Sequence, residues 1–333
     1  RTDALNQSES WTYDGMDHPL SHVDRKQQAT LYTYDALGRR TLTTYADGSG
    51  TQATYDAGNR VTELLDTSGG NLSWSYDDLD RITQAVTPQG TVGYSYDAAG
   101  RRTGMTPASQ AAVTYQYDNV NRLLLITQGS ETVQLGYDEA NRRTSLTLPN
   151  GVFVTYGYDN ANQLIGLVYT QGNGTKLGDL TYSYDAGGQI VAQGGSLVFN
   201  QLPQPTTQPS SFDDNNRQTS FNGATLSYDA DGNLTSDGVN SFVWNARNEL
   251  VQVQQSGVPQ LGFAYDSLGR RASKTVGTST PTQYLYDGSN AVQEVQGATV
   301  NPILTGLGID ERFARNDVIG RAYYLTDVLG STV

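Results

Sequence analysis

The chain has no cysteine, two histidines and a thin supply of apolar residues. Without cysteine there is no disulfide framework, no thiolate metal site and no cysteine nucleophile. Counted with glycine and without tyrosine, apolar residues make up roughly 40% of the 333 residues, against 45–50% in an ordinary globule. The low apolar content favours a fold with a large surface area relative to its hydrophobic core.

Positive charge and long apolar runs are scarce as well. The formal net charge is −13, so a nucleic acid backbone would be repelled and nucleic acid is not expected as a partner. No run of 18 apolar residues occurs, so we expect no membrane insertion by this segment. The opening "RTDALNQSES" has neither Met nor an apolar leader, and we expect a water-soluble piece of a longer polypeptide.

What the chain does contain is a repeat built on Tyr-Asp pairs. Twelve of the 22 tyrosines are followed by Asp, and the first eight pairs, from Tyr13 to Tyr158, come at steps of 20 or 21 residues. Degenerate copies begin at Phe212 and Trp244. A fixed period of this length is typical of repeat architectures.

Each copy predicts one β-hairpin. A second ring often stands two residues before the motif Tyr, as in Tyr32 and Tyr34, Tyr94 and Tyr96, and Tyr156 and Tyr158, a spacing that puts both rings on one face of a strand. Three residues after the Asp comes Gly, Asn or Asp, which tolerate a left-handed turn, and the Asp carboxylate can accept hydrogen bonds from turn amides. An extended, Thr-rich segment and a second turn complete about 21 residues.

The fold class predicted is therefore all-β: about fourteen antiparallel hairpins of about 21 residues each, forming a coiled ribbon or a segment of a hollow β-shell. We expect a single domain over residues 1–333, regular over 11–164, irregular over 165–211 and resumed over 212–333. The proline-rich stretch 199–211 predicts an inserted loop.

The residues of interest are structural members of the repeat. They are Tyr34, Asp35, Gly38, Arg39, Tyr55, Asp56, Asn59, Arg60, Tyr76, Asp77, Arg81, Tyr96, Asp97, Gly100, Arg101, Tyr117, Asp118, Asn121, Arg122, Tyr137, Asp138, Asn141, Arg142, Tyr158, Asp159, Tyr265, Asp266, Gly269 and Arg270. Each Arg is expected to pair with a motif Asp and to stack on a ring of the same or an adjacent hairpin; a ladder of anion sites is the alternative. Where Gln163, Gln189, Asn233, Glu249 or Ala291 replaces the Arg, that contact should fail.

No catalytic, cofactor or metal site is predicted. His18 and His22 with Asp17 and Asp24 imitate a metal cluster, but Asp17 holds the turn position and His18 the Arg position of the first copy. With no other histidine, a Ser-His-Asp arrangement would have to be built in this first repeat.

Carboxylates elsewhere are also read as turn residues. Residues 229–240 resemble a calcium loop but place Leu234 and Asn240 where Gly and Glu are required. Neighbouring carboxylates such as Asp77 and Asp78 lie in one turn and do not face each other across a bond. The chain is therefore not expected to be an enzyme.

The consensus aromatic-x-Tyr-Asp-x-x-Gly/Asn-Arg resembles the YD-repeat or Rhs family, which includes bacterial Rhs polymorphic toxins, the C components of insecticidal toxin complexes, wall-associated proteins and the teneurins. The resemblance covers Trp11 to about Asp327. It implies a hollow β-shell whose partners are its own C-terminal toxin cargo, the remaining shell segments, and a secretion apparatus or toxin-complex component.

The closing "RAYYLTDVLGSTV" is similar to the stretch before the family's self-cleaving core, but the Asp-Pro motif of that core is missing. The resemblance therefore implies a non-enzymatic shell segment of a secreted, extracellular bacterial toxin, carrying neither protease nor cargo. A cell-surface adhesion or glycan-binding module is the alternative, since exposed rings stack on sugar faces.

Overall fold

The computed structural model describes residues 1–198, 209–317 and 319–333. Over these residues every regular element is a β-strand, and within each sheet strands that follow one another in sequence are paired, so the all-β prediction is confirmed. The strands hold all three predicted tyrosine pairs, Tyr32 with Tyr34, Tyr94 with Tyr96 and Tyr156 with Tyr158. No helix among the described residues has the length and apolarity to span a membrane.

The chain divides into two compact units, each assembled from three segments. Unit 1 comprises residues 1–90, 204–285 and 295–299, and unit 2 comprises residues 91–203, 286–294 and 300–333, as far as these are described. Each unit thus combines an early and a late part of the sequence. That the whole chain behaves as one domain stays a prediction.

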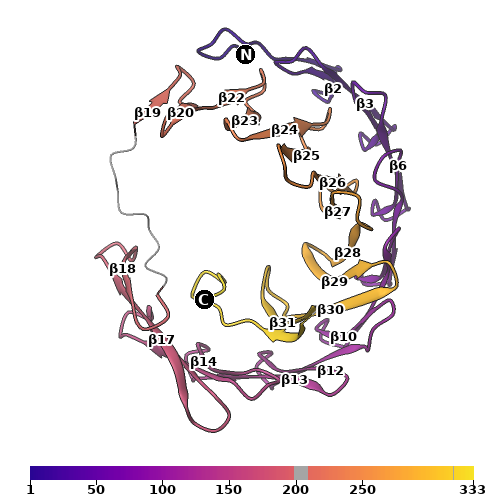
Figure 1. The fold of residues 1–333 in the computed structure, drawn as a ribbon. Coiled ribbons are helices and arrows are strands. Elements are labelled where there is room, and N and C mark those ends of the chain that lie inside the picture. Colours follow the sequence, from indigo (N-terminus) through magenta and orange to yellow (C-terminus); the bar gives the residue numbers. More distant parts are fainter. Residues whose placement is uncertain (199–208, 318) are drawn as a thin grey trace. The chain divides into compact units, whose positions relative to one another are not determined.

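Unit 1 contains two ribbons of hairpins that lie side by side (Figure 1). The first ribbon, residues 1–90, has β1 (Ser10–Tyr13), β2 (Pro19–Val23), β3 (Ala29–Tyr34), β4 (Arg40–Thr44), β5 (Gly50–Tyr55), β6 (Val61–Asp66), β7 (Leu72–Tyr76) and β8 (Ile82–Thr87). The second ribbon, residues 209–285, has β19 (Ser210–Phe212), β20 (Gln218–Phe221), β21 (Ala224–Thr225), β22 (Ser227–Tyr228), β23 (Leu234–Ser236), β24 (Asn240–Trp244), β25 (Leu250–Gln255), β26 (Leu261–Tyr265) and β27 (Arg271–Val276).

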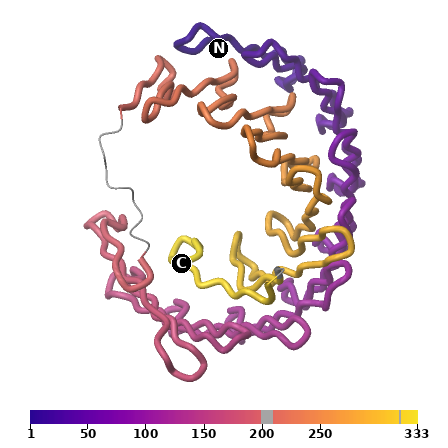
Figure 2. Tube along the Cα trace, in the orientation of Figure 1, coloured from indigo at the N-terminus to yellow at the C-terminus, as the bar shows by residue number. Residues whose placement is uncertain are grey.

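Unit 2 has a long ribbon with the C-terminal strands beside it (Figure 2). The ribbon contains β9 (Gly90–Tyr96), β10 (Arg102–Pro107), β11 (Val113–Tyr117), β12 (Leu123–Gln128), β13 (Glu131–Tyr137), β14 (Arg143–Thr147), β15 (Phe153–Tyr158), β16 (Leu164–Thr170), β17 (Lys176–Tyr184) and β18 (Ile190–Gly194). β31 (Arg312–Asp317) and β32 (Gly320–Tyr323) follow near the end. Besides β9, whose first residue belongs to unit 1, three strands contribute residues to both units: β28 (Thr282–Asp287), β29 (Asn290–Gln296) and β30 (Thr299–Thr305).

A β-bulge lies at the motif tyrosine of hairpin after hairpin. In the hairpin β3–β4, Thr33 pairs with Leu42 and Tyr34 with Arg40, which leaves Thr41 as the extra residue. The same shift recurs at Tyr55, Tyr76, Tyr117, Tyr137, Tyr158, Tyr184 and Tyr265. Because a bulge increases the local right-handed twist, the repeat adds twist at regular intervals.

The inserted loop predicted over 199–211 falls mostly outside the described residues. At its end the prediction is wrong, because Ser210 and Ser211 pair with β20 in the strand β19. Pro209 stands just before that strand, where a missing N–H costs no ladder hydrogen bond.

The apolar core is unevenly divided. Among the described residues of unit 2, many side chains are fully buried, including Met105, Ile126, Leu167, Tyr169 and Leu180. Among the described residues of unit 1, the buried apolar ones are Leu72, Ala272 and Leu285. Unit 1 therefore depends much more on polar contacts between hairpins and between ribbons.

Candidate functional site

The repeated motif closes each Tyr-Asp turn through the Asp carboxylate. Asp35 Oδ1 accepts hydrogen bonds from the backbone N–H of Leu37 (2.9 Å) and of Arg39 (3.0 Å). The residue between them, Gly38, has φ +74°, a left-handed conformation that glycine adopts without strain. Asn59, Asn121 and Asn141 take the same conformation in other copies, and Gly100 and Gly269 have the positive φ predicted for them.

The motif Arg ties its own turn to the next hairpin. Arg39 donates from Nε to Asp35 Oδ2 at 2.7 Å, and its guanidinium lies 4.5 Å from the ring centre of Tyr55. Its Nη1 also donates to Asn59 Oδ1, at 2.9 Å, in the following turn. One guanidinium thus joins two hairpins by an ion pair, a cation–π contact and a hydrogen bond.

The motif Tyr closes the same junction from the other side. Tyr55 donates its hydroxyl hydrogen to the carbonyl of Arg40 in the preceding hairpin, at 2.8 Å. Tyr34, Tyr76, Tyr117, Tyr158 and Tyr265 make the same bond with the residue 15 positions earlier. We call this set of Asp, Arg and Tyr contacts between neighbouring hairpins a rung.

Rungs of this kind recur along both units. The ion pair with the Asp of the same turn is made by Arg39, Arg60, Arg81, Arg101, Arg122, Arg142, Arg217 and Arg270. The next tyrosine lies under the guanidinium in the pairs Arg60–Tyr76, Arg101–Tyr117, Arg122–Tyr137, Arg142–Tyr158 and Arg217–Tyr228. The ion pairs and ring contacts expected of the Arg series are present in these copies.

The rungs also keep their carboxylates ionised. The hydrogen bond from Arg39 lowers the pKa of Asp35, and the one from Arg81 lowers the pKa of Asp77. The remaining motif residues, including Tyr96, Asp97, Asp118, Asp138 and Asp159, occupy the same positions at strand ends and turns.

Two altered copies keep a rung by other means. His18 takes the Arg position, with its Nδ1 3.0 Å from Asp14 Oδ2, and stacks on Tyr34 at 4.9 Å. Asn233 donates both to Asp229 Oδ2 (2.9 Å) and to the next turn. The prediction that the contact fails wherever Arg is replaced is therefore wrong for Asn233, whose amide is long enough to reach both acceptors.

The copy at Trp244 exchanges donor and acceptor. Asn245 stands in the Asp position and donates from Nδ2 to Glu249 Oε2 at 2.7 Å, while its Oδ1 closes the turn. Burial raises the pKa of Glu249. The turn survives because an amide supplies one acceptor and one donor where a carboxylate supplies two acceptors.

At Tyr286 the sequence prediction fails. Asn290, predicted to occupy the turn, begins β29, and the turn consists of Gly288 and Ser289. Asp287 lies outside the usual Tyr-Asp turn. Its carboxylate accepts hydrogen bonds from both Nη groups of Arg102, one of them at 3.1 Å, and from the Tyr94 hydroxyl at 3.0 Å. Burial and this carboxylate raise the pKa of Tyr94.

The structure adds turns of the same geometry that lack a preceding Tyr. Asp3, Asp24 and Asp327 each accept a hydrogen bond from the N–H four residues on, and Asn6, Gln27 and Gly330 have positive φ. A search for Asp followed three residues later by Gly, Asn or Gln, without regard to the tyrosine, would have found them. Asp3 and Asp24 lie at the edge of the first ribbon that we call the opposite edge, while the Tyr-Asp turns form its YD edge.

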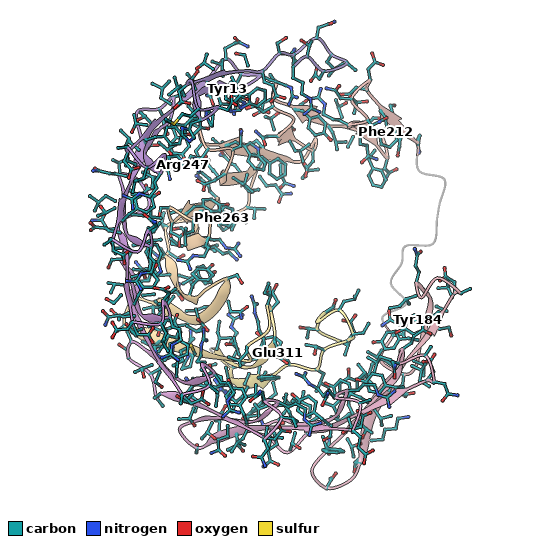
Figure 3. All side chains as sticks on the ribbon, turned by 180° about the vertical axis from the view of Figure 1, so that it is seen from behind. Tyr13, Tyr184, Phe212, Arg247, Phe263 and Glu311 are labelled. Carbon is teal, nitrogen blue, oxygen red and sulfur yellow. The ribbon has the colours of Figure 1, made fainter. Side chains whose placement is uncertain are left out.

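In unit 1 the two ribbons meet at a buried ion pair. Arg247, labelled in Figure 3, donates to Asp66 Oδ2 at 2.7 Å and Oδ1 at 3.1 Å, and its guanidinium lies 4.4 Å from the ring centre of Tyr45. The two side chains are 9% and 0% exposed. Burial opposes ionisation, but hydrogen bonds from Arg247 and the Gly69 N–H outweigh it and lower the pKa of Asp66 to about 2.

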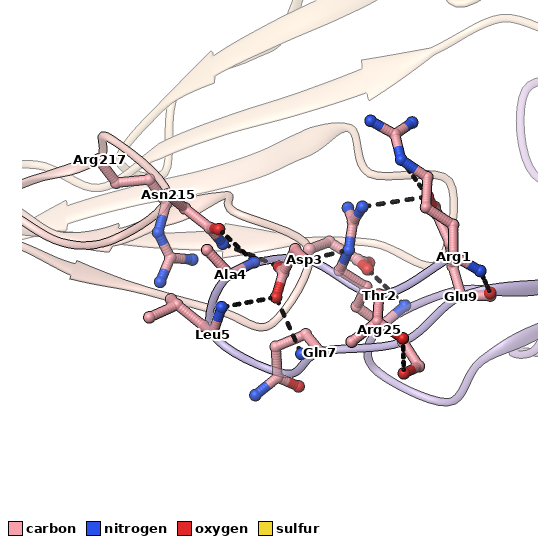
Figure 4. Close-up of polar contacts among 12 residues, drawn as sticks. Arg1, Thr2, Asp3, Ala4, Leu5, Gln7, Glu9, Arg25, Asn215 and Arg217 are labelled. Carbon is pink, nitrogen blue, oxygen red and sulfur yellow. Dashed lines mark hydrogen bonds and ion pairs between the residues drawn. The ribbon is translucent and has the colours of Figure 1, made fainter.

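Two further contacts join these ribbons. Asn215 donates to Asp3 Oδ2 (2.8 Å) and accepts from the Ala4 N–H (3.1 Å), as Figure 4 shows. Asp231 accepts from the Arg25 N–H at 2.9 Å. The pKa of Asp24 is raised mainly by burial and further by the neighbouring Asp231 carboxylate.

Unit 2 holds its C-terminal segment by similar contacts. Glu311 (Figure 3) accepts from Arg143 Nη2 at 2.7 Å, Arg321 pairs with Glu131, and Tyr169 donates its hydroxyl hydrogen to the Thr326 carbonyl at 2.6 Å. A cavity of about 700 Å³ lies between this segment and the rings of Tyr117, Tyr137, Tyr156 and Tyr158.

No convergent group of metal ligands occurs among the described residues. His22 stacks on Trp11 at 4.5 Å instead of joining His18, and Asp229 and Asp231 face Lys26. The carboxylates and guanidinium groups described above pair with one another within the turns and between the ribbons, and so hold the hairpins together.

Two protein-family models match the chain. The RHS repeat model matches residues 17–49, 55–92, 76–112, 96–133 and 117–152, and the teneurin YD-shell model matches residues 152–296. The chain belongs to the YD-repeat, or Rhs, family. Together the two models match residues 17–296 except 50–54, the RHS repeats over the regular part of the repeat and the YD-shell over the part that follows.

Curated relatives match this YD-repeat chain over a short stretch. The tRNA3(Ser)-specific nuclease WapA of Bacillus spizizenii is 34% identical over 118 residues, which is 33% of this chain and 5% of that protein. The tRNA nuclease WapA of Bacillus subtilis strain 168 is 33% identical over 118 residues, again 33% and 5%. The match thus spans a twentieth of the length of these relatives.

Solved structures share the YD-repeat fold over nearly all of the chain. A crystal structure of TcdB2-TccC3-TEV superposes with a TM-score of 0.63 at 14% identity, covering 97% of this chain and 24% of the other. The Photorhabdus luminescens Tc holotoxin pore gives a TM-score of 0.56 at 16% identity, covering 97% and 23%. At this identity the likeness concerns the fold.

Proposed function

We propose that this chain is a non-enzymatic wall segment of a hollow β-shell that encloses and protects a toxic polypeptide. The observation that carries the proposal is the continuous wall within each unit. Rungs join hairpins side by side, and ion pairs such as Asp66–Arg247 join neighbouring ribbons edge to edge. A wall whose charged groups are paired within it offers cargo little to bind, so enclosure takes the place of affinity.

The kinship with Rhs repeats and the Tc folds supports a secreted bacterial toxin as the setting. The cargo is then the C-terminal part of the same polypeptide, and further shell segments and a secretion apparatus or toxin-complex component are the partners. WapA proteins are named as tRNA nucleases, and this chain spans only 5% of their length, which supports a division between a wall segment and a separate toxic part.

The adhesion alternative has less support from the geometry. In the rungs, guanidinium groups lie over ring faces such as those of Tyr55 and Tyr76, so these faces are not free to stack on a sugar. Tyr13 and Phe212 are exposed and keep the alternative testable.

The test is limited proteolysis of the full polypeptide that contains this segment. We expect its C-terminal part to resist protease, and to become susceptible when Arg247→Met opens the ribbon junction, while Arg1→Met at an exposed ion pair leaves protection intact. A C-terminal part cleaved as fast in the native polypeptide as after denaturation would contradict enclosure. Tight binding of a defined sugar that is lost in Tyr13→Ala would favour the adhesion alternative over enclosure.

A further inference from the structure

Four copies of the repeat carry a second arginine directly after the motif Arg. Each begins a strand and pairs there with the motif tyrosine across the hairpin, and the four are Arg40, Arg102, Arg143 and Arg271. The guanidinium of Arg40 lies 5.3 Å from the ring centre of Tyr32, two residues before that tyrosine. The guanidinium of Arg102 lies 4.7 Å from the ring centre of Tyr94, the equivalent ring. The second arginines therefore occupy one equivalent position of the repeat.

In unit 2 this position binds a carboxylate from a distant part of the chain. Arg102 donates from both Nη groups to Asp287, and the Tyr94 hydroxyl donates to the same carboxylate at 3.0 Å. Arg143 donates from Nη2 to Glu311 at 2.7 Å. A guanidinium held in this position presents parallel N–H donors, which is the geometry that a carboxylate fits.

Arg40 differs from these two arginines in its partners. Among the described residues it has the Tyr32 ring as a contact but no carboxylate as an ion-pair partner. Arg40 is exposed, whereas the side chains of Arg102 and Arg143 are 24% and 29% exposed in their ion pairs. Its N–H donors can therefore be approached by a further molecule.

Arg40 lines a pocket of about 200 Å³ in unit 1. One side of the pocket is a face of the first ribbon. Tyr32 pairs with Thr43 across the hairpin, and Thr30 is two residues before Tyr32, so all three side chains lie on that face. A turn of the second ribbon, residues 246–248, lines the other side. The pocket thus places hydroxyl groups beside the guanidinium.

Two further charged groups, Asp24 and Arg247, line the same pocket. The charge of Arg247 is balanced by Asp66, to which it is paired. Asp24 accepts a hydrogen bond from the Gln28 N–H at 2.8 Å, and its negative charge opposes the approach of an anion. The attraction for an anion therefore comes from Arg40, and Asp24 weakens it.

We propose that this pocket binds the carboxylate of a small polar ligand in the way that Asp287 is bound at Arg102. The carboxylate accepts hydrogen bonds from both Nη groups of Arg40 and from the Tyr32 hydroxyl, and the rest of the ligand occupies the space lined by Thr30 and Thr43. Such a carboxylate comes either from a free acid or from an acidic side chain of a polypeptide. The site goes beyond the proposed enclosure, and neither requires the other.

The test is a titration of the 333-residue protein with two probes, followed by saturation-transfer NMR of the probe. Lactate represents a free acid, and a glutamate residue capped at both ends represents an acidic side chain. We expect saturable binding with a Kd on the order of 1 mM, which two charge-assisted hydrogen bonds support. Binding of lactate alone assigns the site to a free acid, and binding of the capped glutamate assigns it to an acidic side chain.

Three variants test the donors and the opposing charge. Arg40→Met should weaken binding at least tenfold, and Tyr32→Phe, which keeps the ring, about threefold to tenfold. Asp24→Asn should tighten binding, because it removes a like charge from the pocket. The control Lys176→Met removes a positive charge from an exposed side chain outside the pocket and should leave binding unchanged.

Far-UV circular dichroism establishes that the variants are folded. If neither probe binds, or if Arg40→Met binds as tightly as the native protein, the inference is overturned. An equal loss of binding in Lys176→Met would overturn it as well, because the protein would then be responding to net charge and not to a site at Arg40.

Discussion

The buried Asp66–Arg247 pair gives the sharpest prediction about what holds unit 1 together. Arg247→Met keeps the length of the side chain but removes both hydrogen bonds to Asp66 and the contact with Tyr45. Breaking a buried ion pair from one side costs about 3–5 kcal/mol in general, because the remaining charge is left unpaired. Here Asp66 retains hydrogen bonds from Thr51 Oγ1 and from the N–H groups of Ser68 and Gly69, which lessen the loss.

The pKa of Asp66 gives an independent scale. A decrease from 3.8 to about 2 corresponds to roughly 2.4 kcal/mol at 1.36 kcal/mol for each pKa unit. Arg247 supplies only part of that shift, but its replacement also removes the contact with Tyr45, so we expect Arg247→Met to destabilise unit 1 by about 2–3 kcal/mol at pH 7. Because the folded-state pKa is lowered, this stabilisation is present above pH 4 and is lost as the pH falls towards 2.

Urea unfolding followed by tryptophan fluorescence reads this change selectively. All three tryptophans, Trp11, Trp74 and Trp244, belong to unit 1. The matched control is Arg1→Met, whose partner Glu9 is reached at 3.9 Å by an exposed side chain and which should cost less than about 1 kcal/mol. If Arg247→Met lies within 0.5 kcal/mol of this control, on the order of a surface substitution, the reasoning about the junction is refuted.

Four further outcomes are expected. Gly100→Val should destabilise by about 1–3 kcal/mol because φ is +81° there, whereas Gly15→Val, with open space around it, should not; thermal unfolding by circular dichroism compares them. Asp24→Asn should stabilise unit 1 at pH 7. Wild type should lose stability as the pH rises from 3.8 through the raised pKa of Asp24, and the variant should not show this loss; a larger pH dependence in the variant would contradict this. Tyr76→Phe, which removes only the hydroxyl bond to Val61, should cost about 0.5–1.5 kcal/mol in urea titrations, and no loss would mean that the rung depends on the ring alone. Because the apolar core lies in unit 2, tryptophan fluorescence should report unfolding at lower urea than circular dichroism, and coincident transitions would show that the chain unfolds as one domain.

The rungs were predictable because their partners are close in sequence. The Asp35 and Arg39 side chains are four residues apart, and Arg39 reaches Asn59 at a distance of 20 residues, one period of the repeat. Because these contacts recur with the same period as the sequence motif, the motif itself predicts them. Substitution by Asn233 was misjudged because the sequence gives residue types but not the reach of an amide between two turns.

Asp287 shows where this reasoning ends. By sequence it belongs to an ordinary Tyr-Asp copy, yet it pairs with Arg102, which is 185 residues earlier. The turn is shortened to two residues, and the carboxylate binds a distant guanidinium. Nothing in the spacing around Tyr286 distinguishes that copy from Tyr265, where the normal turn forms.

The sequence by itself determined the all-β class, the hairpin unit, the left-handed turn positions and the partner of most motif arginines, because each depends on neighbours within about one period. Only the tertiary structure decided which edges of the ribbons meet, that Arg247 reaches Asp66 across 181 residues, and that the core gathers in unit 2. The physical reason is that these features depend on twist accumulated over many hairpins. A small change of twist in each hairpin would bring a different turn opposite Asp66 while leaving every local signal unchanged.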